Sequence, residues 1–171
     1  MHAIIRPRFL GAVLSATSLS CVLLAQQSPQ PPAPIPAQII TARKVFIANL
    51  SADGVYPEYL NSIGGPNRPY QEFYAAMKNL GRYELVATPG DADLVFEIQF
   101  RGDPNVPIKG SFAVTILDVN THFPLWTVVE PVEFGGRQST KQKNVAGAIA
   151  RLVESVKNLA VPPATTANPQ K

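Results

Sequence analysis

The sequence predicts an α+β domain with the element order β-α-β-β-β-β-α, in which a mixed, mostly antiparallel sheet carries two helices on one face. Three observations lead to this prediction. Apolar and polar residues alternate with a period of two over 94–101 and 111–117, as in strands that bury one face. Apolar residues recur at helical spacing over 70–80 and again over 145–159. Turn-forming Gly, Pro, Asn and Asp residues separate these segments.

An apolar amino-terminal segment predicts that the protein is exported. Residues 1–25 have the layout of a secretory signal peptide, in which Arg6 and Arg8 precede an apolar stretch that ends at Ala25. That stretch is at the short limit for a membrane span and is diluted by four Ser or Thr residues, so a retained anchor helix is the less favoured alternative. We therefore expect the protein in the periplasm or cell envelope, or secreted.

Cys21 is the only cysteine and a candidate for lipidation. The residues before it form a poor lipoprotein box, because Leu19 is one place too close to the cysteine, and apolar residues continue beyond it. We favour a signal peptide whose cleavage leaves a mature chain without cysteine, and hence without a disulfide or thiol nucleophile. Contact with a membrane is expected only through the signal or such a lipid anchor.

Composition sets the boundaries of the folded part. Residues 26–38 form a linker rich in Pro and Gln, and residues 161–171 form a tail that we expect to be disordered. Between them, residues 39–160 form a single domain, long enough to fold without disulfides. Removal of the signal lowers the net charge from +3 to +1, because thirteen basic residues then face twelve acidic ones. Nucleic-acid binding needs clustered basic residues, so no nucleic-acid partner is expected.

The first half of the domain contains two predicted strands around a helix. Residues 44–49 are rich in strand-forming side chains. A helix is expected over 68–81, with Asn67 capping its start and Gly81 in the left-handed position that ends it. A short strand follows at 83–87, and a right-handed crossover would place it parallel to the first strand.

The second half contains three more predicted elements. Residues 94–101 form a strand. Residues 111–134 form a hairpin, whose turn lies at 118–122 and whose second strand returns over 125–129. The last helix is expected to start at Ser139, which forms a capping box with Gln142. Its long apolar stripe predicts that it lies on the sheet.

Two acidic residues at the entrance of one strand, Asp91 and Asp93, have two interpretations. A catalytic pair needs one buried carboxyl group near its partner, and a metal site needs further ligands. Nothing in the sequence indicates burial, so we interpret both as residues of a turn and a strand edge. His122 is interpreted as a turn residue for the same kind of reason, since no nucleophile is paired with it. No catalytic residue, metal or cofactor is expected, and the protein is not expected to be an enzyme.

The connection over 51–67 is long for a compact domain, and long loops often carry function. In one interpretation Tyr56, Tyr59 and Ile63, together with Trp126 of the hairpin, line a binding site. In the other, these side chains pack over the sheet and residues 57–63 form a short helical turn. We favour the second interpretation.

Four stretches together carry a resemblance to known proteins: KVFIANL, YQEFYAAMKNLGRYELVATPGDADLVFEIQF, FAVTILDVNTHFPLWTVVEPV and the closing helix. This arrangement resembles a group of small bacterial envelope proteins of unknown function, many of them lipoproteins. More distantly, it is similar to the amino-terminal domain of TolB and to the CsgG-type fold. The resemblance implies a fold and brings no catalytic residues with it.

These observations support one leading functional hypothesis and one alternative. The leading hypothesis is an exported, non-enzymatic envelope protein that acts by protein–protein contact, through the exposed sheet edge or the long loop. Its partner would be an unknown envelope protein or a second copy of the chain. The alternative is a binding module for a small apolar or glycan ligand at the 51–67 loop.

Overall fold

The computed structural model describes residues 33–51, 57–103, 105–106 and 108–160. The predicted signal peptide with Cys21, the predicted tail, most of the linker and Tyr56 lie outside these residues. The elements are α1 (Ala37–Thr41), β1 (Lys44–Asn49), α2 (Pro57–Ser62), α3 (Arg68–Leu80), β2 (Glu84–Leu85), the 3-10 turn η1 (Pro89–Asp91), β3 (Leu94–Gly102), β4 (Lys109–Asp118), β5 (Pro124–Glu133) and α4 (Gln138–Leu159). The predicted order of strands and long helices is confirmed, with two short helices added.

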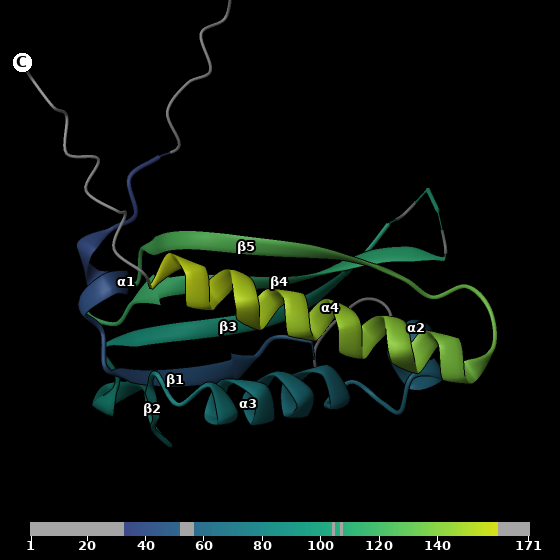
Figure 1. The fold of residues 1–171 in the computed structure, drawn as a ribbon, viewed down its shortest axis with the longest axis horizontal. Coiled ribbons are helices and arrows are strands. Elements are labelled where there is room, and N and C mark those ends of the chain that lie inside the picture. Colours follow the sequence, from purple (N-terminus) through teal and green to yellow (C-terminus); the bar gives the residue numbers. More distant parts are fainter. Residues whose placement is uncertain (1–32, 52–56, 104, 107, 161–171) are drawn as a thin grey trace, which may run out of the picture. The chain divides into compact units, whose positions relative to one another are not determined.

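Five strands form one sheet in the order β2-β1-β3-β4-β5 (Figure 1). Strand β1 pairs in parallel with both β2 and β3, whereas β3, β4 and β5 form an antiparallel meander. The sheet is therefore mixed, as predicted. Its two edges differ greatly in length, because β2 has 2 residues and β5 has 10.

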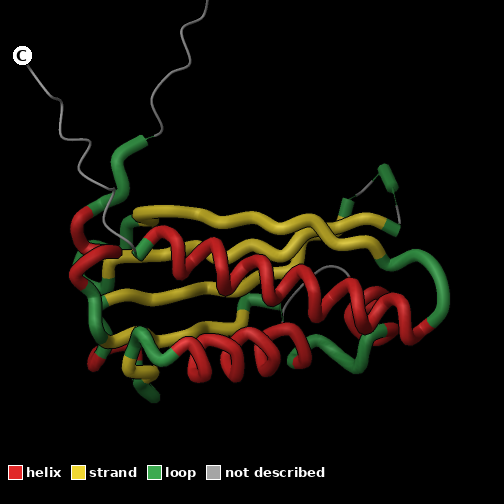
Figure 2. Tube along the Cα trace, in the orientation of Figure 1, coloured by secondary structure: helices red, strands yellow, loops and turns green. Residues whose placement is uncertain are grey.

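Helices α3 and α4 run along the same face of the sheet (Figure 2). The alternation read from β3 is confirmed, since Leu94, Phe96, Ile98 and Phe100 are all buried while the side chains between them are not. The same face of the neighbouring strands and the inner face of α4 complete a single core. Its largest fully buried side chains include Phe73, Phe96, Phe112, Ile39, Leu60, Ile63, Met77, Leu94, Ile98, Ile116 and Leu152.

Helix α3 ends as the sequence predicts and begins differently. Gly81 follows its last residue with φ of 66°, the left-handed conformation that glycine adopts without steric cost. Asn67 occupies the N-cap position, but its side chain makes no capping bond. The Asn67 Oδ1 atom instead accepts a hydrogen bond from Nδ2 of Asn49 at 2.9 Å. The predicted side-chain cap is therefore wrong. Asn67 occupies the expected N-cap position, but its side chain links α3 to the end of β1 instead.

The predicted capping box of α4 is not formed. The helix begins at Gln138, one residue earlier than expected, and Arg137 stands at the N-cap position with an extended backbone and no side-chain bond. Ser139 therefore lies inside the first turn, where its hydroxyl group cannot cap the helix with Gln142. The apolar stripe is confirmed, since one face of the helix is buried from Val145 to Val156.

A buried serine extends the pairing of β1 with β3 beyond the end of the strand. The Leu50 N–H donates to the carbonyl oxygen of Ile98 at 2.9 Å. One residue further, Ser51 is only 1% exposed, and its Oγ accepts a hydrogen bond from the Phe100 N–H at 2.8 Å. A side-chain oxygen thus takes the place of a backbone carbonyl, so the Phe100 N–H is satisfied where the strand has ended.

The ring of Phe100 lies at the centre of an aromatic cluster. Its centroid is 5.2 Å from that of Phe134, 5.4 Å from that of Phe112 and 6.2 Å from that of Tyr59. Beneath this ring is Gly110 of the neighbouring strand, where an added Cβ would lie 2.6 Å from a ring carbon. Glycine is required here for close approach, because no other residue leaves room for the ring.

Candidate interaction edge

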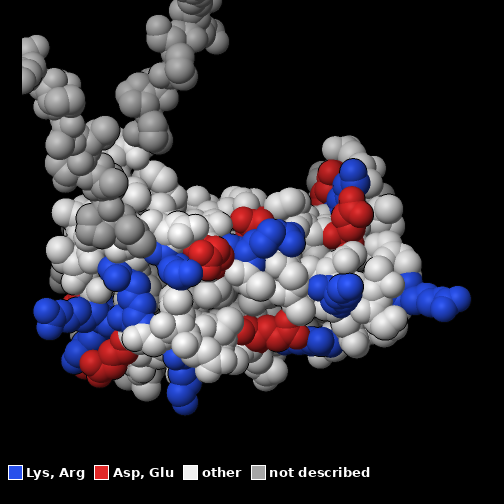
Figure 3. Space-filling view, in the orientation of Figure 1, with Lys and Arg blue, Asp and Glu red and all other residues white. Residues whose placement is uncertain are grey.

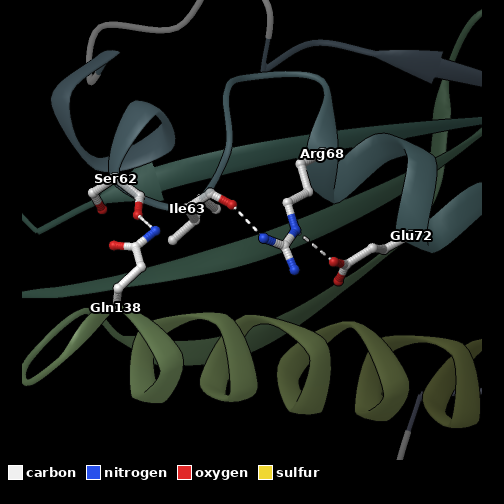
Figure 4. Close-up of polar contacts among 5 residues, drawn as sticks. All are labelled: Ser62, Ile63, Arg68, Glu72 and Gln138. Carbon is white, nitrogen blue, oxygen red and sulfur yellow. Dashed lines mark hydrogen bonds and ion pairs between the residues drawn. The ribbon is translucent and has the colours of Figure 1, made fainter.

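Side chains of both long helices form hydrogen bonds with the carboxy-terminal end of α2, at residues 62–63 (Figure 4). From α3, Nη1 of Arg68 donates to the carbonyl oxygen of Ile63 at 2.6 Å, and Nε of the same side chain pairs with Glu72 at 2.7 Å. From α4, Nε2 of Gln138 donates to the carbonyl oxygen of Ser62. Carbonyl groups at the end of a helix lack partners within it, so these side chains cap α2 and hold the segment in place.

Two candidate binding residues of this segment, Tyr59 and Ile63, pack inward. Ile63 is fully buried in the core. Tyr59 is half-buried, and its ring centroid lies 5.5 Å from that of Phe134. Part of the segment is the helix α2, as the favoured interpretation has it.

Trp126 does not join the residues of α2. It lies half-buried on β5, packs against the core and pairs with Ile116, which in turn pairs with Phe96. Tyr59 instead contacts Phe100, four residues further along β3. At about 3.3 Å per residue, these positions are roughly 13 Å apart along the strand. The structure therefore does not bring Trp126 and Tyr59 into one pocket.

A small hollow does lie beside Tyr59. Its volume is about 240 Å³, and its walls are Tyr59, Ser62, Ile108, Phe134 and Lys141. Ile108 is 54% exposed and forms part of its rim. This hollow offers aromatic surface and one ammonium group beside the 51–67 segment.

Asp91 and Asp93 bond to different parts of the chain. The Asp93 Oδ2 atom accepts hydrogen bonds from the backbone N–H groups of Arg43 at 2.8 Å and Lys44 at 2.9 Å, where β1 begins. These bonds, the one from Lys44 first, hold the pKa of Asp93 below its ordinary value. Asp91 instead accepts a hydrogen bond from the hydroxyl group of Thr88 at 2.7 Å. Asp93 thus holds the start of β1, whereas Asp91 bonds to a side chain within its own turn.

The turn between β4 and β5 is held by one carboxylate and presents an exposed aromatic ring. Oδ1 of Asp118 accepts from the N–H groups of Asn120 and Thr121 and from the Thr121 hydroxyl group, at 2.8–3.1 Å. These bonds, those from Thr121 first, hold the pKa of Asp118 below its ordinary value. His122 adopts a left-handed conformation with φ of 58°, as befits the predicted turn residue. Directly after it, Phe123 is 71% exposed.

Helix α4 closes the outer side of β5 over the last part of that strand. Nη2 of Arg151 donates to the carbonyl oxygen of Pro131 at 3.0 Å, while its Nε pairs with Glu130 at 3.0 Å. Nδ2 of Asn144 donates to the carbonyl oxygen of Glu133 at 3.0 Å. Two carbonyl groups of an edge strand are therefore satisfied by side chains. The shallow groove between these elements has a volume of about 440 Å³.

The same contacts identify which peptide groups of β5 point away from the sheet. Successive residues of a strand direct their backbone groups alternately to either side. The register from Trp126 to Glu133 is unbroken, so Thr127 and Val129 share the outward direction of Pro131 and Glu133. In the part of the chain that the structure describes, no hydrogen bond reaches the outward groups of Thr127 or Val129. We call the outer side of residues 124–130 the open edge.

Sequence reasoning expected an exposed sheet edge without identifying the strand that forms it, and it ended the returning strand at Val129. The observed strand continues to Glu133 and contains Pro124 and Pro131. Proline lacks a backbone donor, so prolines within a strand indicate an edge position. The capping role of Arg151 and Asn144 has no comparable signal, because it depends on where α4 crosses β5.

Charges and ligand groups around the described surface are dispersed. Lys and Arg side chains are interspersed with Asp and Glu on the helix-bearing face (Figure 3). Within residues 33–51, 57–103, 105–106 and 108–160, no three His, Cys, Asp or Glu side chains come together as metal ligands would. Of the helices in these ranges, none is long and apolar enough to cross a membrane.

No family model matches the chain, and no curated protein matches it. Several solved bacterial structures share part of its chain path. Protein XCC0632 from Xanthomonas campestris, described as family DUF330, is 12% identical with a TM-score of 0.46, over 75% of this chain and 87% of that one. Lipoprotein GNA1162 from Neisseria meningitidis is 10% identical with a TM-score of 0.38, over 68% and 99%. The PelC dodecamer from Paraburkholderia phytofirmans is also 10% identical with a TM-score of 0.38, over 64% and 86%.

At this level of similarity no function is transferred from these proteins. The matches are to bacterial proteins, one of them a lipoprotein. The resemblance to the amino-terminal domain of TolB and to the CsgG-type fold stays a prediction.

Proposed function

We propose that this chain is an exported, non-enzymatic protein of the bacterial cell envelope that binds a protein partner through the open edge of β5. The partner would supply an extended strand, which adds to the sheet beside residues 124–130. Export is the prediction from residues 1–25, which precede the domain. The observation that carries the proposal concerns Thr127 and Val129. Their outward-facing backbone N–H and C=O groups have no hydrogen-bond partner among the described residues.

The chemistry of the open edge favours strand addition. Edge strands pair readily with other chains, and natural proteins normally block them. Here Arg151 and Asn144 block only the outer side from Pro131 onward. Val129 is 49% exposed, so both backbone and apolar side-chain contacts are offered to a partner. Added strands use such backbone hydrogen bonds for affinity and alternate side chains for specificity.

The test replaces the donor that a partner strand needs. In Val129→Pro the outward N–H group is lost, while the hydrogen bonds to β4 are kept, because residue 129 faces away from that strand. Val129→Thr is the matched control, since it replaces one methyl group by a hydroxyl group of similar size but keeps the backbone N–H group. A photo-crosslinking amino acid at position 127 reports on contact in the cells that export the protein.

We expect one discrete crosslinked adduct in the wild type and in Val129→Thr, and its loss in Val129→Pro. Circular dichroism of the purified variants checks that all are folded. An adduct that persists at full yield in folded Val129→Pro would show that contact does not use this edge. Absence of any adduct in the wild type would also count against the proposal.

The hollow beside Tyr59 supports a second candidate function, the binding of a small glycan acid. An aromatic ring suits the apolar face of a sugar, and the ammonium group of Lys141 suits a carboxylate. Titration with glucuronate, followed by NMR of the Ile108 methyl groups, tests this idea. We expect saturable shifts that disappear in Lys141→Gln. Unchanged spectra at millimolar glucuronate would remove this candidate.

A further inference from the structure

We propose that the partner at the open edge is a second copy of this chain, which pairs antiparallel with β5 about a two-fold axis at Thr127. This inference rests on the proposed function, because it uses the same edge. It adds the identity of the partner and the register of the pairing.

The length of the open edge determines where the axis lies. Strand β5 begins at Pro124, and the side chain of Arg151 occupies its outer side from Pro131 onward. The accessible stretch is therefore 124–130, and its middle residue is Thr127. An antiparallel partner centred there places its own Pro124 opposite residue 130. Its strand then begins just before Pro131, the first residue whose outer side is covered by Arg151. No part of the second strand then runs across Arg151.

The hydrogen bonds fit the same axis. The outward N–H and C=O groups of Thr127 in one copy face those of Thr127 in the other, and an antiparallel pair of this kind exchanges two hydrogen bonds. Val129 then stands opposite Leu125 of the second copy. The two threonine side chains meet across the axis, a cross-strand pair that stabilises antiparallel sheets.

Registers shifted toward the end of the strand are unfavourable. A pairing centred on Val129 would set Pro131 opposite Thr127 of the second copy, yet Pro131 has no N–H group and its carbonyl oxygen already bonds to Arg151. A pairing centred on Glu130 would set two carboxylates directly opposite each other, which is destabilising. Thr127 at the axis avoids both conflicts.

Charge in the accessible stretch also suits a self-pair. Among residues 124–130 the only charged side chain is that of Glu130. It is bonded within its own chain to Arg151 and, at 3.3 Å, to the hydroxyl group of Ser155. Two copies therefore bring no unpaired like charges together. A closed two-fold pair of identical surfaces is also the commonest form of protein assembly.

Two cysteine variants of the exported mature chain test the register. Thr127→Cys places the two sulfur-bearing residues directly opposite each other, with Cα atoms roughly 5.5 Å apart, which is within the range of a disulfide. Val129→Cys is the matched control, because it lies on the same face of the same edge but would be four residues out of register with its own counterpart. Both proteins are treated with copper phenanthroline at low micromolar concentration.

We expect Thr127→Cys to form at least ten times more covalent dimer than Val129→Cys. We also expect sedimentation velocity of the wild type to show a dimer that Val129→Pro loses. Equal crosslinking of the two cysteine variants would overturn the register. A wild type that stays monomeric up to about 100 μM would overturn the second-copy inference.

The two proposals fail in different ways. If the wild type is monomeric but the in-cell adduct at position 127 joins a different protein and is lost in Val129→Pro, the inference about the second copy fails and the proposed function stands. If Val129→Pro is folded and changes neither the adduct nor the sedimentation, both fail.

Discussion

Gly110→Ala should destabilise the protein through a single close contact. The added methyl carbon would lie 2.6 and 2.7 Å from two ring carbons of Phe100 and 2.9 Å from the carbonyl oxygen of Arg101. The ring cannot easily move away, because Phe112, Phe134 and Tyr59 surround it. Overpacking of a rigid core site costs about 1–3 kcal/mol, and a contact this short places the loss at about 3 kcal/mol. That corresponds to a fall in Tm of roughly 10 °C for a domain of this size.

The matched control is Gly90→Ala, which makes the same chemical change where the added carbon meets nothing within 4 Å. Urea denaturation followed by circular dichroism measures the free energy of unfolding of both variants. We expect Gly90→Ala to be neutral or more stable by up to about 1 kcal/mol, because alanine restricts the unfolded chain. A Gly110→Ala variant as stable as the wild type would refute the reasoning and would mean that the aromatic cluster adjusts freely.

Three further predictions concern polar groups. Ser51→Ala should lower the free energy of unfolding by about 1–3 kcal/mol in urea denaturation, because the buried N–H group of Phe100 loses its acceptor; an unchanged midpoint would contradict this. Tyr83→Phe should raise the free energy of unfolding by about 1 kcal/mol, since the hydroxyl group of Tyr83 is buried without a hydrogen-bond partner. A lower Tm of this variant would show that the hydroxyl group does have a partner. The pKa of Asp93 is lowered in the folded protein, so its ionised form stabilises the protein above the ordinary pKa of 3.8, and that benefit is lost as the pH falls below 3.8 through the folded-state pKa. The stability of the wild type relative to Asp93→Asn should shrink over that window in acid titrations, and a constant difference would contradict the assignment.

Much of the architecture could be predicted because its elements carry strong periodic signals. The alternation in β3 and the stripe of α4 each specify which side chains face the core, and both faces are buried as expected. Gly81 marked the end of α3 because its left-handed conformation strongly favours glycine. These are local rules, in which a residue and its neighbours in sequence determine the outcome.

The misplaced details depend on contacts between distant segments. Asn67 was expected to cap α3, but a bond from Asn49 uses its side-chain oxygen instead. Gln138 reaches Ser62, which is 76 residues away in sequence. No pattern within a window of sequence reveals such pairs. The same limitation applies to the outer side of β5, whose coverage depends on Arg151 of α4.

The unequal lengths of the two sheet edges have a consequence for assembly. If two chains join through β5, the outermost strand on each side of the combined sheet is β2, which has only two residues. Strands this short offer too few backbone groups to recruit another molecule. Because β2 pairs with only the first two residues of β1, this edge is stepped and irregular, and growth of the sheet through it would be less favourable than pairing through β5.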